Sequence, residues 1–311
     1  MDAALALPLI TGVLGACVGS FLNVVIYRLP RSEPELGGLS IRRPARSFCP
    51  GCKRQLRWFE NLPIVSWLAL GGRCRSCRQE ISARYLFVEL LTAFLFGGAA
   101  VVALDSMDGG GEGWVVLLAS LYLVAVCVAV TFIDLDWRII PDEITWPGMA
   151  LGFIASVAAP AVQSQGWLFG KLFGHLGWER HLASAAASLA GIAAGAGVVW
   201  LVGWLGKRAF RPKDAETGEA TDAMGFGDVK YMGLAGAFLG ADGVLLVFFA
   251  GCVLGALGGV IYYAIKRDRY IPFGPFLSIG VLLVALFRVP LADFLLVDWP
   301  RMVQGLFSRS G

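Results

Sequence analysis

The chain has 311 residues, of which 57% are hydrophobic and 16% are charged, and its mean hydropathy is +0.69. Soluble domains carry charge on about a quarter of their residues, so this composition excludes an ordinary soluble domain and predicts a polytopic membrane protein. The formal net charge is only +3, and the placement of the charges is therefore more informative than their sum.

Apolar runs of the length needed to cross a bilayer, about 20 residues, recur along the whole chain. The sixth run is short and rich in glycine. The sequence therefore predicts an all-α polytopic membrane protein with about eight transmembrane helices. The candidate spans are 5–27, 84–104, 114–133, 141–162, 183–206, 228–241, 244–265 and 271–289.

The first run begins without the basic segment of a signal peptide, and its apolar residues continue past Cys17 to Tyr27. We therefore expect residues 1–27 to form an uncleaved first transmembrane helix rather than a lipoprotein signal that is processed at Cys17. Ser20 and Asn23 share one face of this helix. Their polar groups are expected either to hydrogen-bond to a neighbouring helix or to line a substrate site, and the sequence favours neither alternative.

The positions of the basic residues set the predicted orientation. If both termini lie outside, all but five of the 26 Lys and Arg residues fall on the cytoplasmic side, in accord with the positive-inside rule. The polar segment 28–83, which is too long and too basic for a simple loop, is then cytoplasmic. The five exceptions are Lys171, Arg180, Arg288, Arg301 and Arg309.

This cytoplasmic segment contains two C-x2-C pairs, Cys49 with Cys52 and Cys74 with Cys77, separated by 21 residues. Two such turns are typical of a tetrahedral four-thiolate zinc site. A redox pair is the weaker alternative because it leaves the second pair unexplained, and disulfides are disfavoured in the reducing cytoplasm. With four protein ligands the zinc has no open position, so we expect a structural ion that folds a small module.

An apolar span ends at Ile133 and is followed directly by Asp134 and Asp136. A solvated loop explains the acidic residues further along this segment, but it explains Asp134 less well because Asp134 adjoins the hydrocarbon edge. Asp228 begins another span, and the predicted topology puts Asp134 and Asp228 at similar depth on the cytoplasmic side. Two carboxylates that share one site cannot both ionise easily, so the pair can activate a water and protonate a leaving amine. This is the chemistry of an aspartyl protease.

Other hydrolytic arrangements fit the sequence poorly. The two histidines, His175 and His181, fall on the opposite side in this topology, and there is no H-E-x-x-H motif. Next to Asp228, Gly225 and Gly227 lack side chains, so an extended substrate backbone can approach the carboxylate. Lys230 is expected to interact with Asp228 or to extend toward the membrane interface.

Five segments, in chain order, resemble the type IV prepilin peptidases, which are membrane aspartyl proteases of the G-x-G-D type. Together they span most of the chain, so chance agreement is implausible. The segments are GSFLNVVIYRLP (19–30), the cysteine-containing segment 49–77 with NLPIVSWLALGG at its centre, IDLDWRIIPD (133–142), GFGDVK (225–230) and IPFGPFLSIG (271–280).

This resemblance implies a function that composition does not show. Members of the family cleave the basic leader of prepilins or pseudopilins, in type IV pilus or type II secretion systems, at the cytoplasmic face of the bacterial inner membrane. Many then methylate the new N-terminal residue with S-adenosylmethionine. By motif position, Asp134 and Asp228 are the expected catalytic pair, Asp136 is at most a nearby helper, and Gly72 and Arg73 are associated with methylation.

The resemblance also sets expectations for location and partners. Both termini are expected in the periplasm, the partners are prepilins and the lipid bilayer, no nucleic acid is expected, and homo-oligomerisation is left open. The domain prediction is a first helix at 1–27, a methyltransferase-associated zinc module at 28–83 and a protease domain at 84–311. Two departures from the family pattern stand out. Arg73 replaces an expected lysine, and the interval between the aspartates is lengthened within 163–181 and 207–223.

Two alternatives remain open at this point. The first is a peptidase without methyltransferase activity, because the chain has no glycine-rich nucleotide-binding loop. The second is a transporter or metal-handling scaffold that uses intramembrane aspartates as ion ligands, although the acidic residues cluster at one membrane face. Glu60, Glu80 and Glu89 are expected to be solvated or to cap helices rather than to attract the basic leader.

Overall fold

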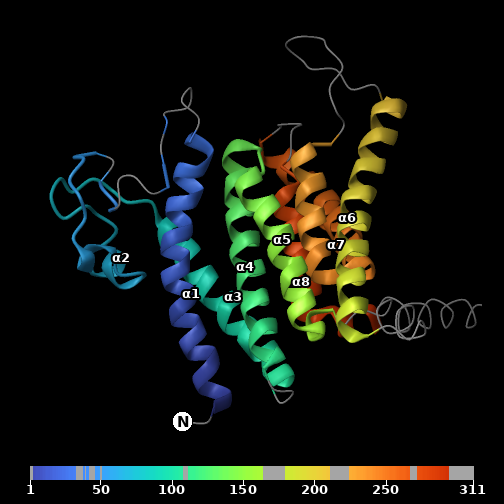
Figure 1. Ribbon diagram of the computed structural model, residues 1–311. Coiled ribbons are helices and arrows are strands. Elements are labelled where there is room, and N and C mark those ends of the chain that lie inside the picture. Colours follow the sequence, from blue (N-terminus) through green and yellow to red (C-terminus); the bar gives the residue numbers. More distant parts are fainter. Residues whose placement is uncertain are drawn as a thin grey trace, which may run out of the picture. The chain divides into compact units, whose positions relative to one another are not determined.

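The computed structural model describes residues 3–32, 38, 40–41, 46–49, 51–107, 111–163, 179–210, 224–266 and 272–293. Most of these residues form helices, and the β-pairing within these ranges is limited to two isolated bridges (Figure 1). The prediction of an all-α membrane protein is confirmed. The segments 163–181 and 207–223, predicted to be lengthened loops, lie largely outside the described residues.

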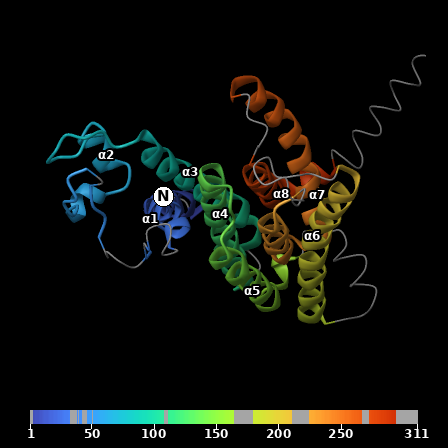
Figure 2. The same ribbon diagram turned by 90° about the horizontal axis from the view of Figure 1, so that it is seen from above.

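The chain divides into two compact units, Met1–Pro147 with Tyr270–Ser278, and Gly148–Arg269 with Ile279–Gly311. In the first unit, α1 (Ala3–Arg28), α3 (Ala83–Met107) and α4 (Glu112–Trp137) pack side by side (Figure 2). The three helices share a core of apolar side chains. It is formed by Leu22, Val25, Ile26 and Leu29 of the N-terminal segment, Val88 of α3, and Val128, Ala129, Phe132 and Ile133 of α4.

Small residues bring α1 close to α3. A Cβ added at Gly19 would lie 2.8 Å from the Cα of Glu89, and one at Gly15 would lie 2.9 Å from the Cα of Ala93. Such close backbone approach is the usual role of glycine between membrane helices. The polar segment between α1 and α3 carries the short helices η1 (Leu29–Arg31), η3 (Trp58–Asn61) and α2 (Val65–Ala69).

The second unit contains most of α5 (Asp142–Ala158), then η4 (Pro160–Val162), α6 (Arg180–Phe210), α7 (Phe226–Lys266) and most of α8 (Gly274–Asp293). Gly240 interrupts α7 with φ 70° and ψ 178°. The carbonyl oxygen of Ala237, one turn earlier, accepts hydrogen bonds from the Ser156, Gln163 and Ser188 side chains at 3.2, 3.0 and 2.9 Å. Polar side chains from neighbouring elements thus satisfy the backbone at the interruption, as a membrane interior requires.

Within the described ranges, five helices are long and apolar enough to cross a membrane: α1, α3, α4, α6 and α7. The structure does not confirm the predicted count of eight spans. The sixth and seventh predicted spans belong to the single interrupted helix α7, α5 has 17 residues, and α8 contributes a shorter apolar stretch, Gly274–Phe287.

We expect Gly191→Ala to weaken the packing of α6 against α7. A Cβ at this position would overlap the carbonyl oxygen of Gly236 and lie 2.8 Å from the Cα of Gly240. The helices must then separate, at a cost of about 1–3 kcal/mol in the free energy of unfolding. Unfolding of the purified protein in detergent mixtures measures this loss. The matched control is Gly197→Ala on the same helix, where an added Cβ meets open space; equal stability of the two variants would contradict the packing argument.

Candidate functional site

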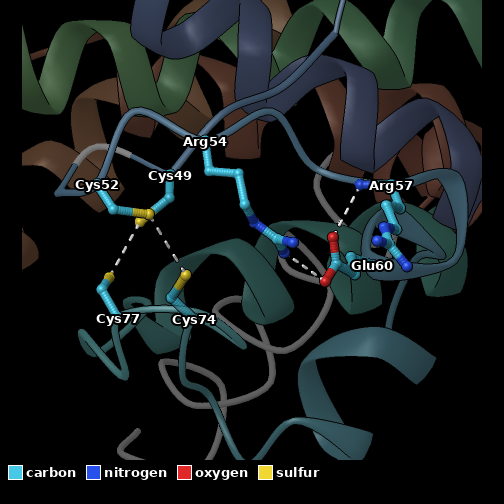
Figure 3. A network of polar contacts seen from close by, with 7 residues as sticks. All are labelled: Cys49, Cys52, Arg54, Arg57, Glu60, Cys74 and Cys77. Carbon is cyan, nitrogen blue, oxygen red and sulfur yellow. Dashed lines mark hydrogen bonds and ion pairs between the residues drawn. The ribbon is translucent and has the colours of Figure 1, made fainter.

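The four predicted zinc ligands converge in the first unit. Their sulfur atoms all lie within 4.8 Å of one another, with Cys49 and Cys74 buried and Cys52 and Cys77 exposed (Figure 3). The Cys49 and Cys77 sulfurs are 3.7 Å apart, and those of Cys52 and Cys74 are 4.0 Å apart. Four thiolates at about 2.3 Å from a central zinc have sulfur–sulfur separations of about 3.8 Å. The thiol geometry therefore fits a tetrahedral zinc ion.

The two C-x2-C turns have the same backbone structure. In the first, the Cys49 carbonyl accepts the N–H of Lys53 at 2.9 Å, and the Cys49 N–H donates to the carbonyl of Arg54 at 2.9 Å. In the second, Cys74 makes the equivalent bonds with the fifth and sixth residues of its turn, at 3.0 and 2.8 Å. Lys53 and Arg78 occupy matching positions with φ 57° and 61°, a left-handed conformation that is uncommon for non-glycine residues. The two turns are thus a structural repeat, and each of them supplies two thiols to one metal site.

The thiols are electrostatically suited to a cation. The backbone N–H groups of Cys77 and Ser76 donate to the Cys74 sulfur and lower the pKa of this thiol to about 6. For Cys77, the N–H of Gln79 favours the thiolate, but desolvation and the neighbouring thiols outweigh it and raise the pKa to about 11. The Cys74 thiol therefore ionises easily, whereas ionisation of Cys77 would be favoured by the positive charge that zinc supplies.

An ion pair connects the first cysteine turn to η3. Arg54 donates to Glu60 at 2.6 Å, and the backbone N–H of Arg57 donates to the other carboxylate oxygen at 2.8 Å (Figure 3). These bonds, led by that of the Arg57 N–H, lower the pKa of Glu60. Of the two roles expected for Glu60, the structure supports helix capping, because its bond to the Arg57 N–H caps η3; its side chain is buried rather than solvated.

The two residues associated with methylation by resemblance lie just before the second cysteine turn. Gly72 has φ 66°, and a Cβ there would lie 2.7 Å from Cζ2 of Trp67, so both the backbone and the contact require glycine. Arg73 pairs with Glu80 at 3.7 Å, and both side chains are largely exposed. Such an exposed pair contributes little stability. The ion pair of Arg73 therefore does not stabilise a buried part of the module.

Asp134 is buried near the end of α4, in the first unit. Its Oδ2 accepts the backbone N–H of Gly274 at 2.9 Å. Gly274 is the first residue of α8, where the N–H groups have no partner within the helix, and Pro275 next to it has no N–H. A Cβ at Gly274 would lie 2.7 Å from Oδ2 of Asp134. Glycine is therefore needed at this position for the carboxylate to contact the helix start.

Asp136 has different surroundings from Asp134. Arg84 at the start of α3 donates to Asp136 at 2.7 Å and to the carbonyl of Phe132 at 3.2 Å, and its guanidinium stacks on the Phe132 ring. About a third of both charged side chains is exposed. Asp136 therefore joins α3 to α4 through an ion pair.

Asp228 lies in the first turn of α7, in the second unit, and is half-buried. Its N–H donates to the carbonyl of Gly225 at 3.1 Å, and a Cβ at Gly225 would lie 3.3 Å from its Oδ2. A helix N-terminus favours a carboxylate in its first turn. Gly227 lies between these residues, and the Lys230 ammonium lies 5.3 Å from the centre of the Phe226 ring.

The structure adds information that the sequence motifs did not contain. The contact of Gly274 with Asp134 joins residues 140 positions apart; the sequence singled out the segment IPFGPFLSIG (271–280), which contains Gly274, but did not indicate this contact. Glu89 is also buried rather than solvated. Nδ1 of His181 lies 2.7 Å from the backbone carbonyl oxygen of Val157, and His175 lies outside the described residues.

Two segments of the chain match known protein families. Residues 13–103, which include the four cysteines, match the bacterial peptidase A24 N-terminal domain. Residues 121–260, which include both Asp134 and Asp228, match the type IV leader peptidase family. The two matches define the class as a membrane leader peptidase with an additional N-terminal domain.

Relatives cover nearly the whole chain. A prepilin leader peptidase/N-methyltransferase of Aeromonas salmonicida is 36% identical over 284 residues, which is 85% of this chain and 84% of the relative. Proteins of the same name from Pseudomonas aeruginosa and Neisseria gonorrhoeae are 33% and 32% identical, over 89% and 88% of both chains. The chain belongs to the prepilin leader peptidase/N-methyltransferase family. No solved structure matches it significantly.

Proposed function

We propose that this protein removes the basic leader of type IV prepilins or pseudopilins at the cytoplasmic face of the bacterial inner membrane and then methylates the new N-terminal residue. The observation that carries the proposal is the buried Asp134, which lies in the segment that matches the type IV leader peptidase family. Its carboxylate accepts the backbone N–H of Gly274 at the start of α8. The names of the relatives support both activities.

In this proposal, Asp134 and Asp228 share one proton. The ionised carboxylate takes a proton from a water molecule, whose oxygen attacks the carbonyl carbon of the scissile peptide. The protonated carboxyl donates its proton to the leaving nitrogen as the C–N bond breaks. The ion pair with Arg84 commits Asp136 to joining two helices, so we assign it no proton transfer. Gly225, Gly227 and Lys230 are proposed to shape the approach of the substrate to Asp228.

The location of the proposed reaction agrees with the substrate. A prepilin has a basic leader followed by an apolar helix in the bilayer, so its scissile bond lies at the cytoplasmic interface. The positions of the Lys and Arg residues support a topology with both aspartates at that interface and the termini in the periplasm. This topology, the inner-membrane location and the prepilin partner all belong to the proposal.

The methylation half of the proposal assigns the zinc ion a structural task. The four cysteines would hold zinc and thereby fold the segment 28–83, which has little apolar core. S-adenosylmethionine, if bound, would supply an activated methyl group, carried on a positively charged sulfur, for the pilin amine. Gly72 and Arg73 are proposed to support this step, and the division into a methyltransferase module and a protease domain stays a prediction.

Gly274→Ala is expected to lower kcat for leader cleavage by about 100-fold, the effect of misplacing a reacting group by about 1 Å. The added Cβ would displace the Asp134 carboxylate, while KM should change little because substrate contacts remain. Steady-state cleavage of a prepilin peptide measures both parameters. The control Gly98→Ala, where a Cβ meets open space, should behave as wild type. A Gly274→Ala enzyme with normal kcat would show that this contact does not position Asp134.

Product masses test the proposed function directly. Purified protein in detergent is incubated with a synthetic prepilin, with and without S-adenosylmethionine, and the products are weighed by mass spectrometry. We expect loss of the leader in both reactions and the added mass of one methyl substituent only with the methyl donor. Normal cleavage with an unmodified amine would show a peptidase without methyltransferase activity. Failure to cleave any prepilin would reject the whole proposal.

A further inference from the structure

A cavity of about 350 Å³ lies in the first unit, between the C-terminal half of α1, the first turns of α3 and the four-cysteine module. Sites for small organic ligands typically enclose about 300–1,000 Å³, so the cavity is large enough for such a ligand. The proposed cleavage chemistry uses none of its lining residues. It therefore requires a separate explanation.

The charge of the cavity is predominantly negative. Of the charged side chains described along its wall, three are acidic, namely Glu60, Glu80 and Glu89, and one is basic, Arg28. Glu60 and Glu89 are only 7% and 8% exposed. Buried carboxylates are costly unless they face positive charge or hydrogen-bond donors. Glu60 is already paired with Arg54, and Glu80 is paired with Arg73. Glu89 has no ion pair among the described residues, so it is the wall carboxylate that suits a positively charged group of a ligand.

Glu89 is held in place by an unusual backbone conformation. It accepts the N–H of Ile64 at 2.7 Å, and Ile64 has φ 63°, a region that β-branched residues rarely occupy. A carboxylate has about four lone-pair positions, so Glu89 can accept further donors while it holds Ile64. Strained residues of this kind concentrate at functional sites.

Aromatic side chains form another part of the wall, including Tyr27, Trp67 and Tyr85. The indole N–H of Trp67 donates to the carbonyl of Ile81 at 3.1 Å, and Gly72 packs directly against the ring. The orientation of the ring is thus fixed from two sides. A fixed aromatic face can stack on a purine base and can interact favourably with a cation.

We propose that this cavity binds the methyl donor S-adenosylmethionine, an inference that rests on the proposed methyltransferase activity. The ligand has one adenine, one carboxylate and two positive groups, the ammonium and the sulfonium. The aromatic wall would contact the adenine, Glu89 would face a positive group, and Arg28 would face the carboxylate. The cavity lies between the zinc module and the membrane helices α1 and α3. A methyl donor bound there would therefore lie beside the helices of the first unit.

Calorimetric titration of the full-length, zinc-loaded protein with S-adenosylmethionine tests the assignment without requiring turnover. We expect Glu89→Gln to weaken binding by at least about tenfold, the value of a hydrogen bond to a charged group. Glutamine retains an oxygen that can accept the Ile64 N–H, so the local backbone should persist. The matched control Glu143→Gln, at an exposed position outside the cavity, should bind as wild type does. Leader cleavage should be unchanged in both variants.

Ultraviolet cross-linking of radiolabelled S-adenosylmethionine to the wild-type protein provides a test without any variant. Labelled peptides should come from residues 20–28 or 47–89. Label found only in other peptides, or equal affinity of Glu89→Gln and wild type, would overturn the cavity assignment. If the wild-type protein still forms a methylated product, the proposed function would stand even then. A wild-type protein that cleaves prepilin but neither binds the methyl donor nor methylates would reject the methyltransferase proposal and the cavity assignment together.

Discussion

Asp134→Asn and Asp228→Asn are each expected to lower the rate of leader cleavage by at least about 1,000-fold, because asparagine cannot accept or donate the proton that the proposed mechanism transfers. The replacement is nearly isosteric. At position 134 the amide oxygen can still accept the N–H of Gly274, so the start of α8 should keep its place. Initial rates with purified variants and a prepilin peptide, at matched protein concentration, measure the loss.

Asp136→Asn serves as the matched control for this prediction. It removes the same charge two residues away, from a half-exposed side chain whose partner is Arg84. Exposed ion pairs of this type contribute about 0–1 kcal/mol, so cleavage should fall less than about tenfold. If either Asp134→Asn or Asp228→Asn cleaves as fast as this control, that aspartate is not one of the proton-transferring pair.

Cys74→Ser is expected to abolish zinc binding and to unfold the module. Structural zinc contributes about 10–16 kcal/mol of apparent binding free energy in small zinc domains, far more than the few buried residues of this segment can replace. Metal analysis should show one zinc per wild-type chain and none in the variant. Trypsin should then cut at the basic residues of the module, and methylation should be lost because the wall of the proposed methyl-donor cavity is gone.

Cys17→Ser and Cys252→Ser make the same chemical change outside the cluster, at two exposed cysteines of membrane helices. Both should retain zinc, trypsin resistance and methylation. A Cys74→Ser protein that keeps stoichiometric zinc and a trypsin-resistant module would contradict the four-thiolate assignment.

Local patterns were sufficient to predict several parts of this molecule. The spacing of the four cysteines predicted their convergence because each C-x2-C turn presents two thiols to one ion, and the structure confirms it. The long apolar runs predicted the membrane helices because bilayer thickness sets their length. The number of apolar runs did not give the number of membrane helices, because Gly240 interrupts α7 without ending it. Composition does not distinguish such an interruption from a loop between two helices.

Features that depend on distant contacts could not be predicted in this way. The requirement for glycine at position 274 comes from Asp134 on another helix, and no local pattern encodes that neighbour. Likewise, the sequence predicted solvated or helix-capping roles for Glu60 and Glu89. Their burial depends on the folded module, in which Glu60 bonds to Arg54 and Glu89 accepts the N–H of Ile64. The left-handed backbone of Lys53 and Arg78 is imposed by the cysteine turns rather than by residue preference.

The proposed proximity of Asp134 to Asp228 is most directly tested by cross-linking. The double variant Asp134→Cys with Asp228→Cys, in a protein whose Cys17, Cys127 and Cys252 are replaced by alanine, is treated with a short bis-maleimide while zinc protects its four ligands. We expect an intramolecular cross-link between the two introduced thiols, identified by peptide mass spectrometry. Pairing Asp134→Cys with Asp242→Cys, about 21 Å further along α7, should give none. A double variant at positions 134 and 228 that reacts at both thiols but never forms the link would contradict the shared aspartate site.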